Sequence, residues 1–252
     1  MNYEDRIVCF LDILGFKEHV KESNSSKSKV KEIADALLAV RRALDIDSPD
    51  EIDRDGANIT QFSDSIVISF KCDEKSGVFY TLLKLIWIQA TLVNHGMLVR
   101  GSIVKGDFIH NDKILFGQGI IDAYEAETKA AVYPRIILGN DVLHIALNYA
   151  EHNPVQEAGY ISKMIKQDTD SLYYIDYLGE GVESEFNDPE FEYIDYLKKI
   201  RDIIDSNIGA KSIGIKTKYG WLKSKHNQNI DKISDRLKKL GISPIDLKSK
   251  HK

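Results

Sequence analysis

The sequence predicts an α+β fold in which helices cover a β-sheet. Two observations lead to this prediction. Through the first 138 residues, short apolar strand patterns and amphipathic helical patterns follow one another in the order strand, helix, strand, strand, helix, strand. Each predicted helix is apolar along one stripe, so it needs a sheet to cover. The chain has 252 residues, of which 43% are hydrophobic and 29% charged, so it can bury a large core.

Apolar residues spaced three or four apart predict the helices, and short apolar runs between turn residues predict the strands. In chain order, the predicted elements of the core are a strand from residue 6 to the turn at Gly15, a helix at 25–44, an acidic turn-rich interval at 47–56, strands at 58–62 and 65–70, a helix at 75–95, strands at 97–104 and 113–116, a helix at 120–131 and a strand at 135–138. Gly96 stands where a C-terminal helix cap would, and Gly101 and Gly106 are expected in turns. This βαββαβ order is typical of ferredoxin-like folds.

The pattern becomes less regular behind the core. It predicts a helix at 141–151, strands at 159–167 and 171–177, an acidic linker at 179–188 and final helices at 189–207 and 211–240. We therefore expect a core at 1–138 and an extension at 139–252, which packs on the core or at a dimer interface.

Composition limits the function classes. No apolar run reaches the length of a membrane span, and the N-terminus lacks the pattern of a signal peptide, so we expect a cytoplasmic protein. Cys9 and Cys72 are expected to be free, packed thiols. Net charge is −5, yet the C-terminal helices are rich in lysine. We interpret these lysines as a solvated helix face and expect no nucleic-acid partner, although such a face could also contact nucleic acid, a membrane or another protein.

Two aspartates at strand edges form the candidate metal site. Asp12 lies within the segment FLDILGF at 10–16, and Asp64 lies in the predicted hairpin turn of QFSDSIVIS at 61–69. A buried carboxylate must be paired, hydrogen-bonded or metal-bound, and Mg²⁺ prefers carboxylate oxygens. The βαββαβ order makes their two strands neighbours. The alternative is that Asp12 caps a helix and Asp64 is an ordinary turn residue.

These two segments resemble the metal-binding motifs of class III nucleotidyl cyclase catalytic domains, whose core is a ferredoxin-like palm. The segments LVRGSIVKG at 98–106 and LFGQGIIDAYEAE at 115–127 are similar to the next strand and the strand-to-helix turn of that family. The resemblance covers about residues 6–138. It implies two Mg²⁺ or Mn²⁺ ions held by Asp12, Asp64 and the carbonyl of Ile13, and backbone amides of Leu14, Gly15 and Phe16 that face the triphosphate.

The sequence departs from that family at four positions. The purine-reading positions hold Thr60 and Ile114, and the positions of the asparagine and arginine that contact ribose and phosphate hold Ile121 and Glu125. In these departures the chain looks more like the pyrimidine cyclases of bacterial antiphage (Pycsar) signalling.

A cation must replace the missing arginine, since charge grows on the phosphate during the reaction. Arg135 is the first choice, Arg100 the second, and Lys105 and Lys129 are further possibilities; each could equally form an ordinary ion pair. Tyr124 could stack on a base or lie in the core. The candidate substrate-binding residues are Ile13, Leu14, Gly15, Phe16, Thr60, Ser63, Lys105, Ile114 and Tyr124.

The resemblance implies a metal-dependent cyclase that converts CTP or UTP to a 3′,5′-cyclic nucleotide and pyrophosphate. It also implies a homodimer whose active sites are shared between the two chains. Two alternatives remain open at this point. The chain could be a cyclase-like nucleotide sensor or interaction protein without turnover, or a palm-type oligonucleotide polymerase.

Overall fold

The structure is a computed structural model that describes residues 2–44, 57–151 and 153–250. The acidic interval predicted at 47–56 lies outside these residues. The strands are β1 (Glu4–Leu14), β2 (Asn58–Phe62), β3 (Ser65–Lys71), β4 (Leu98–His110), β5 (Leu115–Phe116), β6 (Ile136–Leu138), β7 (Ile165–Gln167) and β8 (Tyr173–Ile175). The helices are α1 (Phe16–Ser23), α2 (Lys27–Ala43), α3 (Gly77–Asn94), α4 (Gln118–Lys129), α5 (Asn140–Asn148), α6 (Pro154–Met164), α7 (Glu180–Glu183), the π-helical turn η2 (Pro189–Tyr193), α8 (Ile194–Asn207), α9 (Ile213–Lys232), α10 (Ser234–Lys239) and α11 (Pro244–Leu247).

The strands form one mixed sheet in the order β2-β3-β1-β4-β6-β8-β7, and β5 pairs with β4. Strand β1 is antiparallel to both β3 and β4, whereas β6 is parallel to β4. The first four strands and the helices between them therefore have the ferredoxin-like βαββαβ arrangement, and the predicted α+β fold class is confirmed. The short strands β6, β8 and β7 extend the same sheet on the β4 side.

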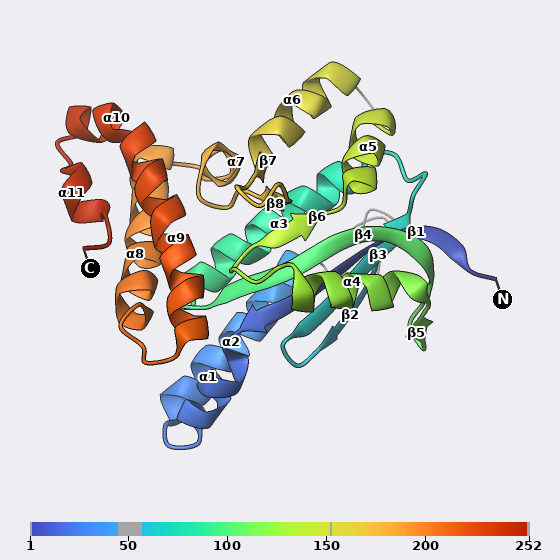
Figure 1. The fold of residues 1–252 in the computed structure, drawn as a ribbon, viewed down its shortest axis with the longest axis horizontal. Coiled ribbons are helices and arrows are strands. Elements are labelled where there is room, and N and C mark those ends of the chain that lie inside the picture. The colour runs from blue at the N-terminus through green and yellow to red at the C-terminus, as the bar shows by residue number, and fades with distance from the viewer. Residues whose placement is uncertain (1, 45–56, 152, 251–252) are drawn as a thin grey trace.

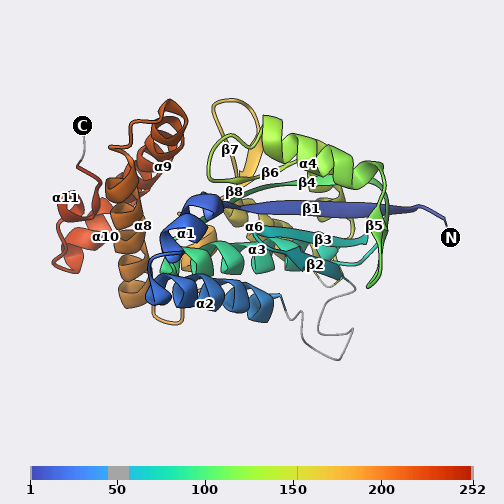
Figure 2. The same cartoon turned by 90° about the horizontal axis from the view of Figure 1, so that it is seen from below.

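Three layers follow from the apolar faces of these elements (Figures 1 and 2). Helix α4 covers one face of the sheet, while α2 and α3 lie on the other. Alternate residues of β1 face opposite layers: Ile7, Cys9, Leu11 and Ile13 belong to the main core, and Val8 packs with Val67, Phe108 and Ala123 beneath α4. Cys9 and Cys72 are free thiols, as predicted.

Helix α3 explains the most apolar stretch of the sequence. Among the described residues it is the one helix long and apolar enough to cross a membrane by length and composition, and 56% of that window is buried inside the structure. A core helix of this kind passes the same test. Gly96 follows α3 with a φ of 72°, which confirms the expected glycine at its C-terminal end.

Strand β4 runs on beyond its predicted end. Gly106 was expected in a turn, but it lies inside β4, where a Cβ atom would come within 2.8 Å of the Cα of Gly119. The first turn of α4 crosses the strand at this point, so both glycines are needed for close packing rather than for chain reversal. Gly101 is likewise inside β4, where a Cβ atom would lie 2.6 Å from the carbonyl oxygen of Phe10.

Two further predictions in the extension were wrong. The segment 159–167 was expected as a strand, but most of it belongs to α6, which begins at Pro154 after the Asn153 side chain accepts hydrogen bonds from the amides of Val155 and Gln156. An asparagine followed by proline is the helix-start signal that the strand prediction overlooked. The acidic segment at 179–188 was expected as a linker, but it contains α7, whose Val182 is fully buried in the main core.

Helices α8, α9, α10 and α11 gather at one end of the sheet, where β1 ends and β4 begins (Figure 1). Their buried side chains belong to the same hydrophobic cluster as those of β1 and α3, including Leu197, Ile204, Leu222 and Leu247. Part of the extension therefore packs directly against the βαββαβ core.

Candidate functional site

The two aspartates of the candidate metal site lie at the same end of the sheet, where β1 ends and β3 begins. Asp12 stands opposite Ser65 of β3 and opposite Arg100 of β4. Asp64 directly precedes Ser65, and its backbone oxygen accepts a hydrogen bond of 3.1 Å from the amide of Ile13. The hairpin turn is therefore joined to β1 one residue beyond Asp12.

The turn itself explains how β2 and β3 reverse without a glycine. Ser63 adopts a φ of 56°, the left-handed conformation that such a turn requires. The alternative role of Asp12 as a helix cap is wrong, because Asp12 lies within β1 and the N-cap of α1 is Gly15, with a φ of 76°. Asp64 is indeed a turn residue, but one whose position is tied to the Asp12 strand.

A partly buried ion-pair cluster surrounds Asp12. Arg100 Nε lies 3.6 Å from Asp12 Oδ2 and also pairs with the carboxylate of Glu127, which projects from α4. The side chain of Glu127 is only 2% exposed, and Thr128 donates a hydrogen bond of 3.0 Å to its Oε2. One guanidinium therefore serves two carboxylates, and Asp64 adds a third negative charge nearby.

This charge imbalance appears in the protonation of Asp12. Burial, together with the negative charges of Glu127 and Asp64, raises the pKa of Asp12 to about 6 against the opposing effect of Arg100. Carboxylates that repel each other at a partly desolvated edge are the usual setting for a bound cation.

The donor set fits a divalent ion that keeps open positions. Asp12 and Asp64 could supply two hard oxygen ligands, and the Ile13 carbonyl, next along β1, could supply another. The described residues contain no group of three or more histidine, cysteine, aspartate or glutamate side chains arranged to enclose a metal. The site therefore suits Mg²⁺ or Mn²⁺ held by two carboxylates together with substrate oxygens, rather than a closed protein cage.

The prediction that Arg135 replaces the family's phosphate-binding arginine was wrong. Arg135 is fully buried, and its guanidinium pairs with Asp170 and, at 2.5 Å, with Asp168. The ring of Tyr133 covers it, with the centroid 5.0 Å from Cζ. Two carboxylates neutralise Arg135 in the extension, so it is not available to a phosphate at Asp12. The second choice, Arg100, is the arginine that contacts Asp12.

The other predicted substrate residues lie in different surroundings. The hydroxyl of Thr60 is 2.9 Å from His110 Nε2, and Nδ1 of the same ring is 2.9 Å from Ser69. Ile114 is 42% exposed in the loop between β4 and β5. The ammonium group of Lys105 forms an ion pair of 2.8 Å with Asp5 rather than with a residue of the aspartate site.

One residue of α4 contacts the strand that carries Asp12. Tyr124 is 55% exposed and rests edge-on against Phe10, two residues before Asp12 on the same strand. Ile121 is also exposed, and Glu125 pairs with Lys129 on the helix surface. Tyr124 is therefore well placed to meet a ligand, whereas Lys129 is paired with a neighbour on its own helix.

Sequence reasoning missed Glu127, which belongs to this cluster, and Lys218, whose protonation the cluster affects. Glu127 lies one helical turn after the fully buried Ala123, on the inner face of α4. A glutamate at such a position could have been predicted from the sequence to form a buried ion pair. Lys218 of α9 is half-buried, and the charges acting on it include Arg100, Asp12 and Glu127. No local pattern could have connected a lysine of the C-terminal helices with β1.

No family model matches the chain, and no curated protein is similar to it. Similar solved structures include a bacterial light-regulated adenylyl cyclase, with 14% identity over 69% of this chain and 52% of that chain and a TM-score of 0.45. Others are the adenylyl cyclase CyaB from P. aeruginosa (13%, 69% and 94%, TM-score 0.43) and the guanylyl cyclase Cya2 (14%, 69% and 93%, TM-score 0.42). The chain spans about half the length of the light-regulated enzyme. The fold assignment rests on the strand order of this chain.

Proposed function

We propose that the protein is a metal-dependent nucleotidyl cyclase that converts a nucleoside triphosphate to a 3′,5′-cyclic nucleotide and pyrophosphate. One observation carries this proposal: the pairing of β1 with β3 and β4 brings Asp12, Asp64 and Arg100 together at one sheet edge. Carboxylates beside a cation are the parts that phosphoryl chemistry requires. The resemblance of their two sequence segments to class III cyclase motifs points to the same reaction.

Each residue has a separate task in this proposal. Asp12, Asp64 and the Ile13 carbonyl would hold the metal ions, which when bound supply Lewis-acid activation of the ribose 3′-hydroxyl and neutralise phosphate charge. Helix α1 begins at Phe16, four residues after Asp12, and the amides of Leu14, Gly15 and Phe16 at its start would bind phosphate oxygens. Arg100 would offset charge that develops on the α-phosphate.

We favour CTP or UTP as the substrate. The two positions that read a purine in the resembling family hold Thr60 and Ile114, and the Thr60 hydroxyl already contacts His110. Tyr124 offers an exposed aromatic face or hydroxyl to a base. A pyrimidine product would agree with a role in antiphage signalling within the cytoplasm, and by the same resemblance we propose a homodimer.

A nucleotide sensor without turnover is the second candidate. Ile121 is exposed and Glu125 is paired with Lys129 at the positions where the resembling enzymes use asparagine and arginine. Neither side chain can replace its counterpart, because one is apolar and the other has the opposite charge.

The test is incubation of the purified protein with each of the four ribonucleoside triphosphates and Mn²⁺, followed by mass analysis of the products. A 3′,5′-cyclic nucleotide is expected, and Asp64→Asn should abolish it. Asp112→Asn, at an exposed position in the β4–β5 loop, is the matched control and should retain wild-type turnover. Nucleotide binding without product would instead favour the sensor, and a linear oligonucleotide product would favour a polymerase.

A further inference from the structure

Helix α9 of the extension is seated firmly against the end of the sheet. The Trp221 ring stacks on Tyr133 with centroids 5.3 Å apart, and its Nε1 donates a hydrogen bond of 2.7 Å to Asp168. Four residues later, Lys225 donates a bond of 2.6 Å to the same carboxylate. These contacts determine which face of α9 points inward.

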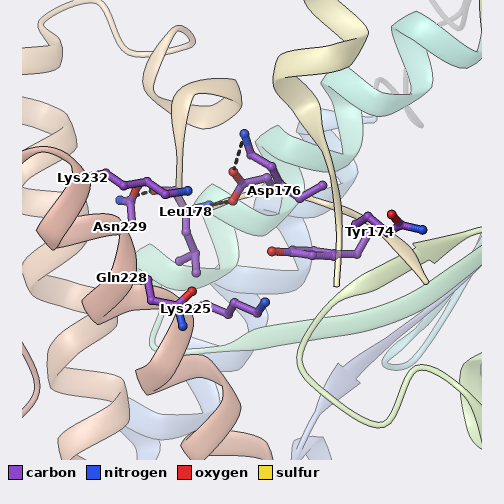
Figure 3. Close-up of a pocket in the computed structure, with 9 residues that line it drawn as sticks. Tyr174, Asp176, Leu178, Lys225, Gln228, Asn229 and Lys232 are labelled. Atoms are coloured by element: carbon purple, nitrogen blue, oxygen red, sulfur yellow. Dashed lines mark hydrogen bonds and ion pairs between the residues drawn. The ribbon is translucent and has the colours of Figure 1, made fainter. Parts of the chain in front are cut away.

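Another turn along, α9 is attached by a further contact (Figure 3). Asn229 donates a hydrogen bond of 2.7 Å to the backbone oxygen of Leu178. Lys225, Asn229 and Lys232 lie on one side of a cavity of about 180 Å³, and Tyr174 and Asp176 lie across from them. The inward face of α9 therefore carries a continuous row of bonded or packed residues.

Lys218 belongs to the same row. It precedes Trp221 by three residues and Lys225 by seven, so helical periodicity puts it on the inward face. At 1.5 Å of rise per residue, Lys218 lies about 4.5 Å along the axis from Trp221, towards the beginning of α9. Arg135 connects this face of α9 with β4: its guanidinium lies 5.7 Å from the centroid of the Trp221 ring, and its backbone oxygen accepts a hydrogen bond of 3.1 Å from the amide of Gly101, next to Arg100.

The end of α4 connects Trp221 with the aspartate site. Trp221 and Ala126 of this helix pack against the same small cluster of Ala131, Ile137 and Tyr174, and Glu127 follows Ala126 in the chain. Glu127 holds Arg100, and Arg100 contacts Asp12. Burial and the charge of Arg100 lower the pKa of Lys218, whereas Asp12 and Glu127 act in the opposite direction, as expected for an ammonium beside this cluster.

Arg100 and Lys218 differ in whether their charged groups already have partners. Arg100 is shared between Asp12 and Glu127. Across the described ranges, by contrast, no hydrogen bond or ion pair holds the ammonium group of Lys218. A half-buried lysine on the inward face of α9 without a fixed partner is available to a phosphate.

We propose that Lys218 is a phosphate-positioning residue, supplied to the Asp12 and Asp64 site by the C-terminal extension of the same chain. The inference rests on the proposed function, since it assigns the triphosphate of that site as the ligand. It also gives α9 a role beyond packing. The positive charge that a nucleotide needs would come from Arg100 and Lys218, in place of Arg135 and the missing family arginine.

The experiment uses full-length protein and measures the affinity for inorganic tripolyphosphate in the presence of Mn²⁺ by calorimetry. Lys218→Met should weaken binding about tenfold or more, because it removes a charge-assisted contact with the phosphate chain. Lys218→Arg should restore most of the affinity. Lys216→Met is the matched control, because Lys216 is an exposed lysine of the same helix, and it should leave affinity unchanged.

Thermal denaturation of each variant checks the fold, and Lys218→Met is expected to unfold within about 2 °C of the wild type. Wild-type affinity in Lys218→Met, or no tripolyphosphate binding by the wild type, would overturn the proposal. If Lys218→Met weakens binding but the wild type forms no cyclic product, the cyclase proposal fails and the phosphate site remains. If the wild type and Lys218→Met form product with equal KM, the cyclase proposal stands and the assignment of Lys218 to the phosphate site fails.

A mixing experiment tests whether Lys218 acts within its own chain. Asp12→Asn keeps Lys218 intact, and Lys218→Met keeps Asp12 intact. A mixture of the two variants should show no more product than the sum of the separate proteins. Restored turnover in the mixture would overturn the assignment to the same chain, because it would mean that Lys218 serves the site of a partner.

Discussion

Replacing Asp12 by asparagine should stabilise the metal-free protein while it removes a metal ligand. The folded protein binds the Asp12 proton more tightly than the unfolded chain does, because the pKa is about 6 in the fold against an ordinary value of 3.8. The sign follows directly: the contribution of Asp12 to stability is favourable at low pH and is lost as pH rises from about 4 to about 6. Above that range the ionised carboxylate destabilises the fold.

The size of the effect follows from the same difference. Each pKa unit corresponds to about 1.4 kcal/mol, so the ionised carboxylate costs at most about 3 kcal/mol. The side chain is 26% exposed, and solvent screening reduces the expected gain of Asp12→Asn to roughly 1–2 kcal/mol at pH 7.5. For a chain of this length, this free energy raises Tm by roughly 3–6 °C.

Differential scanning fluorimetry from pH 4 to pH 8, with chelator present, measures this shift. The Tm gain of Asp12→Asn should be small near pH 4, grow up to pH 6 and then stay constant. Asp112→Asn should show no such gain. In Mn²⁺ the order should change, since the wild type gains stability from a bound ion and the variant does not. A variant that is less stable than the wild type at pH 7.5 without metal, or a gain independent of pH, would refute the reasoning.

Three further outcomes are expected. Arg135→Met should destabilise the protein by about 3–5 kcal/mol in urea unfolding, because it leaves the buried carboxylate of Asp168 without its arginine, and unchanged stability would contradict the buried ion pair. Gly101→Ala should cost roughly 1–3 kcal/mol in the same assay, since a Cβ would lie 2.6 Å from the Phe10 oxygen, and a neutral effect would contradict that close approach. His110 should stay neutral down to about pH 5, because burial lowers its pKa to about 4, and stability should fall as pH drops from 6.5 towards 4; NMR titration of its ring would reveal a higher pKa.

The first half of the fold was predictable because its signals are local. The periodicity of 58–62 and 65–70 matches β2 and β3, and the helix predicted at 75–95 is α3 with small changes at its ends. The order of these elements then determined the neighbours of β1, since βαββαβ chains have few ways to arrange their strands. The sequence alone therefore predicted that Asp12 and Asp64 lie close together.

Long-range contacts decided the rest. Gly106 has the same local signature whether it forms a turn or admits a crossing helix, and only the position of α4 distinguishes the two. Arg135 could have served Asp12 from its place in the strand order, but Asp168 and Asp170 of the extension take its charge. Their positions depend on how β8 and α9 pack, which no local pattern encodes.

The sequence by itself determined the element order, the two strand-edge aspartates and the class of ion they suit, because these depend on periodicity and on residue chemistry. Only the tertiary structure decided which cations accompany them. Arg100 of β4 lies opposite Asp12 of β1, and Glu127 of α4 pairs with Arg100. Lys218 belongs to a helix some two hundred residues away in the chain. Electrostatic partners depend on distance in space, and that distance is set by packing rather than by position in the sequence.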